Sequence, residues 1–97
     1  IKLISQYCNK KIKLKSPNDI MVNKKKICGI LQETIKKNNT QYLIVGIGLN
    51  LVSSPKINQY PTTSLYDLTN SKISANKISK DLKIMYKNFL KSQMSFQ

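Results

Sequence analysis

The sequence contains no arginine and no histidine, and only four of its 97 residues are acidic. With no histidine and no Cys-x-x-Cys pair, the sequence argues against a zinc site. Cys8 and Cys28 are instead expected to be buried, reduced thiols of a cytosolic protein. No apolar run approaches the roughly 20 residues that a membrane-spanning helix needs, and no signal peptide is visible.

All of the basic residues are lysines, and they give a formal net charge of +13. One reading of this charge is a small basic module that binds nucleic acid or an anionic membrane. The other reading is codon drift, because lysine, asparagine and isoleucine dominate the sequence and have A/T-rich codons. The lysines are scattered, the tyrosines are dispersed, and arginine, the residue favoured for phosphate recognition, is missing. These features favour codon drift, and the nucleic-acid-binding module stays as the alternative.

The length allows one small domain with a modest core, and 40% hydrophobic residues is typical of a chain that folds. Because the chain opens with Ile1 rather than Met, we expect it to be a piece of a longer protein. Strand-type patterns, each apolar or alternating, occupy the segments 12–15, 20–22, 26–34 and 42–52. The last of them is a nearly unbroken apolar run, which predicts a central strand that is covered on both faces.

Helical spacing is found at both ends of the sequence. Residues 1–8 read as the last turns of a helix, and a short helix is predicted from Thr63, with a Ser or Thr as its N-cap. From about Ser74, four apolar residues recur at helical spacing among lysines and predict an amphipathic helix that lies on the sheet: Ile78, Leu82, Met85 and Phe89. The expected fold is therefore α+β, with an antiparallel or mixed sheet and helices packed on one face.

The connections carry turn residues. Pro17 opens a turn, residues 35–41 read as a polar connection, and 53–61 as a loop with two prolines. Residues 20–22 and 26–34 read as the arms of a hairpin with its loop at 23–24.

This hairpin predicts a charged pair. A loop at 23–24 places Met21 opposite Lys26 and Asp19 opposite Cys28. Asp19 and Lys26 then emerge on one face as diagonal neighbours. A carboxylate beside an ammonium keeps it charged and fixes its direction, so that the ammonium could neutralise charge on a phosphoryl or carboxyl oxygen. The alternative is an ordinary surface ion pair.

A second candidate is "GIGLN", residues 46–50, at the end of the long apolar run. It lacks the third glycine of a dinucleotide-binding fingerprint. Gly46 and Gly48 would let a ligand or a neighbouring backbone approach closely, and Asn50 would present a carboxamide at the rim of the sheet. A bulge with a polar strand end is the structural alternative.

Taken in order, "KSPNDI", "KKICGIL", "VGIGLNL" and "PTTSL" resemble the motifs of the biotin–protein ligases. The spacing fits the C-terminal half of their catalytic domain from about Lys13 onward. The resemblance implies that residues 1–97 form a single partial domain of a class II synthetase-like fold, without its N-terminal half. Lipoate–protein ligases share this fold, but their motifs differ.

The resemblance also implies a chemistry. A cytoplasmic, ATP-dependent ligase would activate biotin as biotinyl-adenylate with Mg²⁺ and transfer it to a lysine of a biotin carboxyl carrier domain. Lys26 matches the catalytic lysine, and Mg²⁺ would lie near Asp19. The biotin- and adenylate-binding positions that carry over are Asn18, Asp19, Lys26, Gly29, Gly46, Gly48 and Asn50.

Three departures from the family pattern limit this expectation. Ser16 stands where the family has tryptophan, and Lys24 stands where a turn glycine is common. The Gly-Arg-Gly-Arg loop that closes over biotin cannot come from a chain without arginine. We therefore expect the chain alone to be inactive and to need a separate N-terminal half, with an inactive remnant of the ligase as the alternative.

Overall fold

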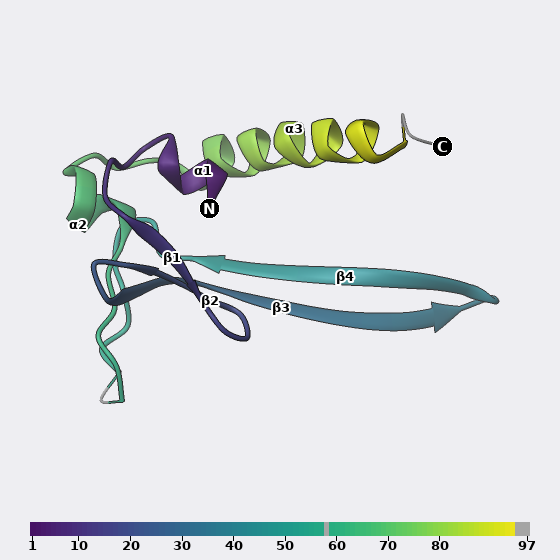
Figure 1. Ribbon diagram of the computed structural model, residues 1–97, viewed down its shortest axis with the longest axis horizontal. Helices are drawn as coiled ribbons and strands as arrows, with labels where there is room; N and C mark the ends of the chain where they lie inside the picture. The colour runs from purple at the N-terminus through teal and green to yellow at the C-terminus, as the bar shows by residue number, and fades with distance from the viewer. Residues whose placement is uncertain (58, 95–97) are drawn as a thin grey trace.

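The computed structural model describes residues 1–57 and 59–94. It contains a four-stranded antiparallel sheet of order β1-β2-β3-β4, with α1 and α3 on one side of it (Figure 1). This α+β arrangement is the predicted one. The elements in chain order are α1 (Lys2–Ser5), β1 (Ile12–Lys15), β2 (Asp19–Val22), β3 (Lys25–Lys37), β4 (Thr40–Leu49), α2 (Leu65–Thr69) and α3 (Ala75–Met94).

The hairpin of β2 and β3 turns at Asn23 and Lys24, as predicted, with positive φ angles of 51° and 64°. Met21 pairs with Lys26, but the register then shifts by one residue, and Asp19 pairs with Gly29. The predicted pairing of Asp19 with Cys28 is therefore wrong. The reason is a bulge, which inserts an extra residue and turns two successive side chains to one face. Accordingly, the adjacent side chains of Ile27 and Cys28 are both buried, at 0% and 3% exposure.

The hairpin of β3 and β4 is longer than predicted. The polar residues of 35–41 continue both strands, and only Asn38 and Asn39 form the turn, with φ angles of 52° and 63°. The predicted polar connection is wrong because two asparagines tolerate the left-handed backbone that a two-residue hairpin turn requires.

The prediction of a central, doubly covered strand at 42–52 is also wrong. Strand β4 lies at the edge of the sheet, where it pairs with β3 only among the described residues. Five of its large apolar side chains are exposed: Tyr42, Leu43, Ile44, Val45 and Ile47. The apolar run correctly predicts a strand, but the run alone does not show whether other elements pack against that strand.

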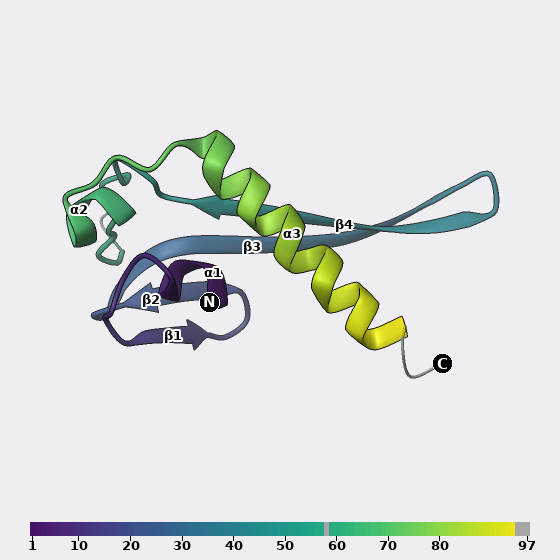
Figure 2. The same ribbon diagram turned by 90° about the horizontal axis from the view of Figure 1, so that it is seen from above.

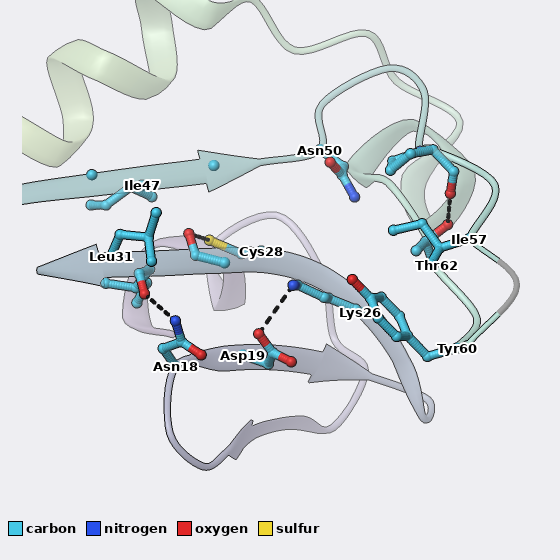
Figure 3. A pocket seen from close by; sticks show the side chains of 15 residues that line it. Asn18, Asp19, Lys26, Cys28, Leu31, Ile47, Asn50, Ile57, Tyr60 and Thr62 are labelled. Carbon is cyan, nitrogen blue, oxygen red and sulfur yellow. Dashed lines mark hydrogen bonds and ion pairs between the residues drawn. The ribbon is translucent and has the colours of Figure 1, made fainter.

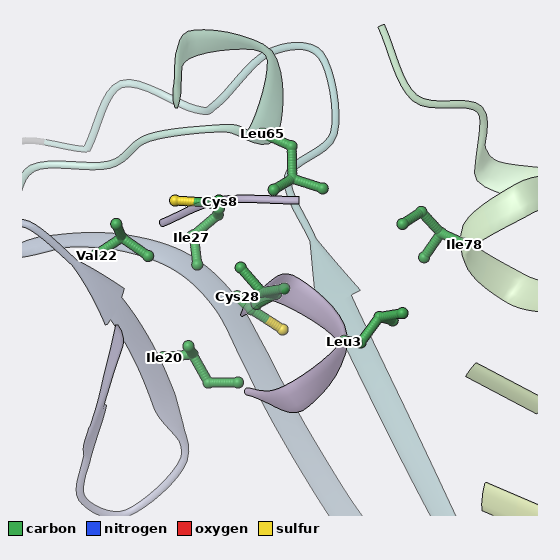
Figure 4. Packing of buried hydrophobic residues seen from close by; sticks show 9 residues of the cluster. Leu3, Cys8, Ile20, Val22, Ile27, Cys28, Leu65 and Ile78 are labelled. Atoms are coloured by element: carbon green, nitrogen blue, oxygen red, sulfur yellow. The ribbon is translucent and has the colours of Figure 1, made fainter. Parts of the chain in front are cut away.

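The core lies at the other end of the sheet (Figure 4). It joins α1, β2, the bulged start of β3, α2 and the first turns of α3. Its buried residues are Leu3, Ile4, Cys8, Ile20, Val22, Ile27, Cys28, Leu65 and Ile78. The two cysteines are buried free thiols, as predicted, and burial raises the pKa of the Cys28 thiol above its usual value.

Both predicted C-terminal helices are confirmed. Ser64 is the N-cap of α2, and its hydroxyl accepts a hydrogen bond from the Asp67 amide at 3.1 Å. In α3, Ile78 is buried and Leu82 packs against the core, but Phe89 is 57% exposed. The predicted apolar face of α3 is thus covered over its first turns only, where the helix crosses the sheet obliquely (Figure 2).

The end of α1 is tied to α3 by a polar cluster. The Tyr7 hydroxyl donates to the Asp81 carboxylate at 2.6 Å, and the Lys77 ammonium lies 3.2 Å from the same oxygen.

Among the described helices, none is long and apolar enough to cross a membrane.

Candidate functional site

A cavity of about 550 Å³ lies on the sheet face that points away from α1 and α3, and the connection from β4 to α2 walls one end of it (Figures 1 and 3). All seven positions that the sequence singled out line this cavity: Asn18, Asp19, Lys26, Gly29, Gly46, Gly48 and Asn50. They come from the turn before β2, from β2 itself, from β3 and from β4 with its C-terminal end. The structure therefore brings together residues that are up to 32 positions apart in the chain.

The backbone of Lys26 is fixed by the segment that precedes α2. Its amide donates to the Pro61 carbonyl at 2.9 Å, and its carbonyl accepts from the Thr63 amide at 2.8 Å. These two bonds form a short parallel bridge between Lys26 and Thr62. Because backbone pairing on both sides sets where a side chain leaves the strand, the ammonium of Lys26 starts from a defined position.

The side chain of Lys26 is directed by two contacts. Its Nζ lies 3.1 Å from Oδ1 of Asp19 and 5.2 Å from the centre of the Tyr60 ring (Figure 3). The predicted Asp19–Lys26 pair is confirmed, and both side chains are about one quarter exposed, at 25% and 24%. The hydrogen bond to Asp19 raises the pKa of Lys26, the partial burial opposes this, and Tyr60 adds to the rise. Lys26 is therefore a cation at neutral pH.

The bulge explains how this pair forms in spite of the shifted register. Asp19 lies opposite Gly29, and the Lys26 side chain crosses Gly29 to reach it. A Cβ placed on Gly29 would lie 3.5 Å from both Cε and Nζ of Lys26, which is ordinary van der Waals contact. A side chain at Gly29 would therefore not clash with Lys26. The absence of that side chain leaves more room above the floor of the cavity.

The other two glycines extend this floor. Gly48 pairs with Gly29, and Gly46 pairs with Leu31. No glycine has a positive φ, and Cβ atoms on Gly46 and Gly48 would lie at least 3.9 Å from their nearest neighbours. Backbone strain therefore does not require glycine at these positions. Their effect is to lower the floor so that a ligand can lie against the strand backbone.

The carboxamides of Asn18 and Asn50 hold the walls of the cavity. Asn18 Nδ2 donates to the Ile30 carbonyl at 2.7 Å, which closes the turn before β2 onto β3. Asn50 Nδ2 donates to the Thr63 carbonyl at 3.0 Å, and the Asn50 amide donates to the Ile27 carbonyl at 2.9 Å. Each asparagine thus joins segments that are distant in sequence but adjacent at the site.

Sequence reasoning missed Tyr60 and gave Thr62 only as part of a motif that begins a helix, without a role at the cavity. Tyr60 covers Lys26, and the Thr62 hydroxyl donates to the Pro55 carbonyl at 2.6 Å, which closes the loop beside the cavity. The two prolines predicted a loop, but no sequence signal indicates that the loop returns to β3. That return depends on the long-range pairing of Lys26 with Thr62.

The cavity has a single carboxylate, that of Asp19. In the part of the chain that the structure describes, no three His, Cys, Asp or Glu side chains are close enough to hold a metal ion. Mg²⁺ typically binds through one or two carboxylates together with water and substrate phosphates. This donor set fits a cation that arrives with a phosphate-bearing substrate better than a resident metal.

Comparison with known proteins shows which proteins this chain resembles. A model of the biotin/lipoate A/B protein ligase family matches residues 3–50. The matched segment contains Asn18, Asp19, Lys26 and the glycines of the floor, so the resemblance to this family includes most of the candidate site.

Solved structures extend the likeness to nearly the whole chain. The apo biotin protein ligase from Aquifex aeolicus matches with a TM-score of 0.69 and 29% identity, over 93% of this chain and 40% of that one. A point mutant of the same enzyme in complex with biotin gives the same TM-score and identity, over 93% and 38% of the two chains. Its complex with biotin and ATP matches at 0.61 and 28%, over 79% and 32%. The chain thus has the fold of part of a biotin ligase catalytic domain and spans about two fifths of the matched protein.

Proposed function

We propose that this chain is the C-terminal half of the catalytic domain of a biotin–protein ligase and that Lys26 is its catalytic residue. The observation that carries the proposal is the position of the Lys26 ammonium. It lies 3.1 Å from the Asp19 carboxylate, over the glycine floor of the cavity. The family match and the likeness to a ligase in complex with biotin and ATP support the choice of substrates.

In the first step, a carboxylate oxygen of biotin attacks the α-phosphorus of Mg-ATP. A phosphorus–oxygen bond forms, the α–β phosphoanhydride bond breaks, and pyrophosphate leaves. Negative charge is concentrated where carboxylate and phosphate meet, so that a positioned cation lowers the barrier. Lys26 is suited to this role because Asp19 keeps it protonated and Tyr60 limits its movement.

In the second step, the amine of an acceptor lysine attacks the carbonyl carbon of biotinyl-adenylate. The amide bond forms, the amine loses a proton, and AMP leaves with the bonding pair. The acceptor we propose is a biotin carboxyl carrier domain of acetyl-CoA carboxylase or a related enzyme, in the cytoplasm. Gly29 and Gly48 leave the floor of the cavity low enough for the adenylate to lie along β3 and β4.

The exposed apolar surfaces support the proposal that further parts of a ligase domain pack on this chain. On β4, Leu43 and Ile47 are 58% and 46% exposed, and on α3 Phe89 is 57% exposed. Exposed patches of this kind mark interaction surfaces. The matched structures are about two and a half times longer than the segment they share with this chain. An N-terminal half of the domain would cover these residues and bring the arginines that are absent from residues 1–97.

The test measures biotin transfer to a carrier domain by the chain combined with a ligase N-terminal half, biotin and Mg-ATP. Lys26→Met is expected to lower the rate by about 100-fold or more, since it removes one preorganised charge contact at the reacting centre. Lys25→Met is the matched control, because Lys25 is the exposed neighbour on the same strand. Equal rates for the two variants would remove Lys26 from the mechanism, and no transfer under any condition would favour an inactive remnant.

A nucleic-acid-binding module remains the alternative function. Base stacking requires aromatic side chains on one exposed face. Tyr60 lies at the cavity, Tyr7 contacts α3, and Tyr42 lies near the hairpin tip. Tyr66 belongs to α2, and Tyr86 lies beside Phe89 on the exposed part of α3, with the ring centres 6.5 Å apart. The five tyrosines are thus dispersed over the fold rather than gathered on one face, and the ligase proposal is preferred.

A further inference from the structure

A second concave surface adjoins the candidate site. It has a volume of about 590 Å³ and lies at the outer edge of the sheet, beside β1. We call it the basic groove, and its lining residues are Lys11, Lys13, Leu14, Lys15, Met21, Asn23 and Lys24. Four of these seven residues are lysines, and the lining contains no carboxylate.

The register of the sheet connects the groove to the site. Lys15 pairs with Asp19, and Lys13 pairs with Met21, which in turn pairs with Lys26. Residues that pair across neighbouring strands project from the same face of a sheet. Lys13 and Lys15 therefore point to the face that carries the Asp19–Lys26 pair, and Lys15 is separated from Asp19 by one strand spacing of about 4.8 Å.

The charge of the groove is not neutralised within the described part of the chain. Its two ion pairs use Lys26 and Lys77, and neither involves a lysine of the groove. Like charges around one concavity repel one another and create a positive potential, which attracts an anionic surface. The lysines of α3 differ in this respect, since they are distributed along an exposed helix.

The floor of the groove indicates the kind of anion. Met21 pairs with Lys13 and is half-buried, so that an apolar side chain lies among the lysines on this face of the sheet. Leu14 pairs with the buried Ile20 and therefore projects from the opposite face. Protein interfaces likewise have apolar side chains at the centre and polar ones at the rim. Single-stranded nucleic acids instead require aromatic platforms, and the lining of the groove contains no aromatic residue.

From these observations we propose that the basic groove docks the acidic face of the acceptor protein whose lysine enters the neighbouring site. This inference rests on the proposed ligase function, because that function requires a protein acceptor. The groove would hold the acceptor while the Asp19–Lys26 pair remains free to contact the activated acid. Electrostatic docking of this kind mainly accelerates association and selects partners with the complementary charge.

The test measures binding and not catalysis. The apo carrier domain of a biotin-dependent carboxylase is titrated into the full chain by calorimetry at low and at high ionic strength. The groove variant is Lys11→Glu, Lys13→Glu, Lys24→Glu, and Lys15 is left in place because it adjoins Asp19. The control variant is Lys80→Glu, Lys83→Glu, Lys87→Glu on α3, which has the same net charge and changes three exposed lysines.

We expect the groove variant to weaken binding about tenfold or more and to lose most of its salt dependence, since contacts and steering are both removed. The α3 variant should weaken binding by about twofold, through net charge alone. The corresponding glutamine triple in the groove should give an intermediate loss, and it replaces the glutamate triple if circular dichroism shows a disturbed fold.

Equal weakening by the two triples, no weakening by the groove triple, or no binding of the carrier domain would each overturn the inference. Groove-dependent binding of RNA without binding of the carrier domain would also overturn it, in favour of a nucleic-acid partner. Binding of a non-hydrolysable biotinyl-adenylate analogue distinguishes the two proposals. Loss of that binding in Lys26→Met tests the ligase site, and its persistence in the groove triple shows that only docking was removed.

Discussion

The two ends of the β3–β4 hairpin both carry large apolar side chains but have opposite environments. At the near end, Ile27 and Cys28 are buried, and the Ile27 carbonyl accepts a hydrogen bond from Asn50. At the far end, Leu43 and Ile44 are 58% and 43% exposed on a strand that pairs on one side only among the described residues. The same two strands thus form a fixed site at one end and an uncovered ribbon at the other.

The difference between the ends comes from what packs on the strands, not from the strands themselves. At the near end, the bulge turns two side chains into the core, and the segment before α2 pairs with Lys26. The Pro61 carbonyl accepts from the Lys26 amide, and the Thr63 amide donates to the Lys26 carbonyl. At the far end, no element within the described residues supplies a second layer. A site residue can be positioned precisely only where a second layer fixes the strand that carries it.

The largest effect is expected from shortening a side chain at the buried end. Ile27→Ala should lower the free energy of unfolding by about 2–4 kcal/mol, because it leaves a cavity in a side-chain position with 0% exposure. Leu43→Ala, at the exposed end, should change it by less than about 0.5 kcal/mol. Urea denaturation followed by circular dichroism measures both values.

If Ile27→Ala leaves too little folded protein to measure, Ile27→Val provides a milder change of about 0.5–1.5 kcal/mol. A contrasting result, with Leu43→Ala as costly as Ile27→Ala, would show that the far end of the hairpin is covered in solution. In that case the comparison of the two ends would no longer hold for the chain in solution.

An intermediate effect is expected where the segment before α2 begins the helix. The Ser64 hydroxyl is buried, accepts from the Asp67 amide at 3.1 Å and donates to the Val52 carbonyl at 3.3 Å. Ser64→Ala should cost about 1–2 kcal/mol through the lost cap and an unpaired buried group. The exposed Ser53, in the same loop, serves as the matched Ser→Ala control in the same unfolding experiment.

Local patterns of the sequence were sufficient to predict much of this fold and the Asp19–Lys26 pair, whereas Asn18 and Gly29 were indicated only by the family resemblance. The Asn23–Lys24 turn, the Ser64 cap and the start of α3 each depend on chemistry within a few residues. The Asp19–Lys26 pair followed from the two-residue turn because same-face neighbours across a hairpin stay within reach of a long lysine side chain. The contact also forms with the one-residue register shift. The residue opposite Asp19 is then Gly29, which has no side chain to block the path of Lys26.

One error was local, because Asn38 and Asn39 are a turn signal within 35–41, and the other errors concern what lies outside the local pattern. A bulge at Ile27 depends on core packing from α1 and α2, which no alternation in β3 reveals. The apolar run in β4 indicates a strand but not its place in the sheet. The contact of Tyr60 with Lys26 requires a loop to return to β3, a long-range event that the prolines at its ends do not specify.

The contrast between a fixed and an uncovered end recurs in α3. Its first turns contain the buried Ile78, and their Lys77 and Asp81 form a polar cluster with Tyr7, which follows α1. Further along the helix, Ile84 and Phe89 are 54% and 57% exposed. In this cluster Asp81 accepts a hydrogen bond from Tyr7 and forms an ion pair with Lys77, and the cluster can be weakened by pH without altering the core.

The smallest effect is therefore expected from protonating Asp81. Hydrogen bonds from Tyr7 and Lys77 lower the pKa of the Asp81 carboxyl below its ordinary value of 3.8. Since the folded-state pKa is the lower one, this carboxylate stabilises the fold fully above the ordinary value, and its contribution is lost as the pH falls toward the folded-state pKa. Asp81→Asn should lower the melting temperature slightly at neutral pH and converge with the unmodified chain in acid. Glu33→Gln, on the exposed end of the hairpin, is the control, and an Asp81→Asn difference that stays constant down to acid pH would show that the cluster does not tie α1 to α3 through this carboxylate.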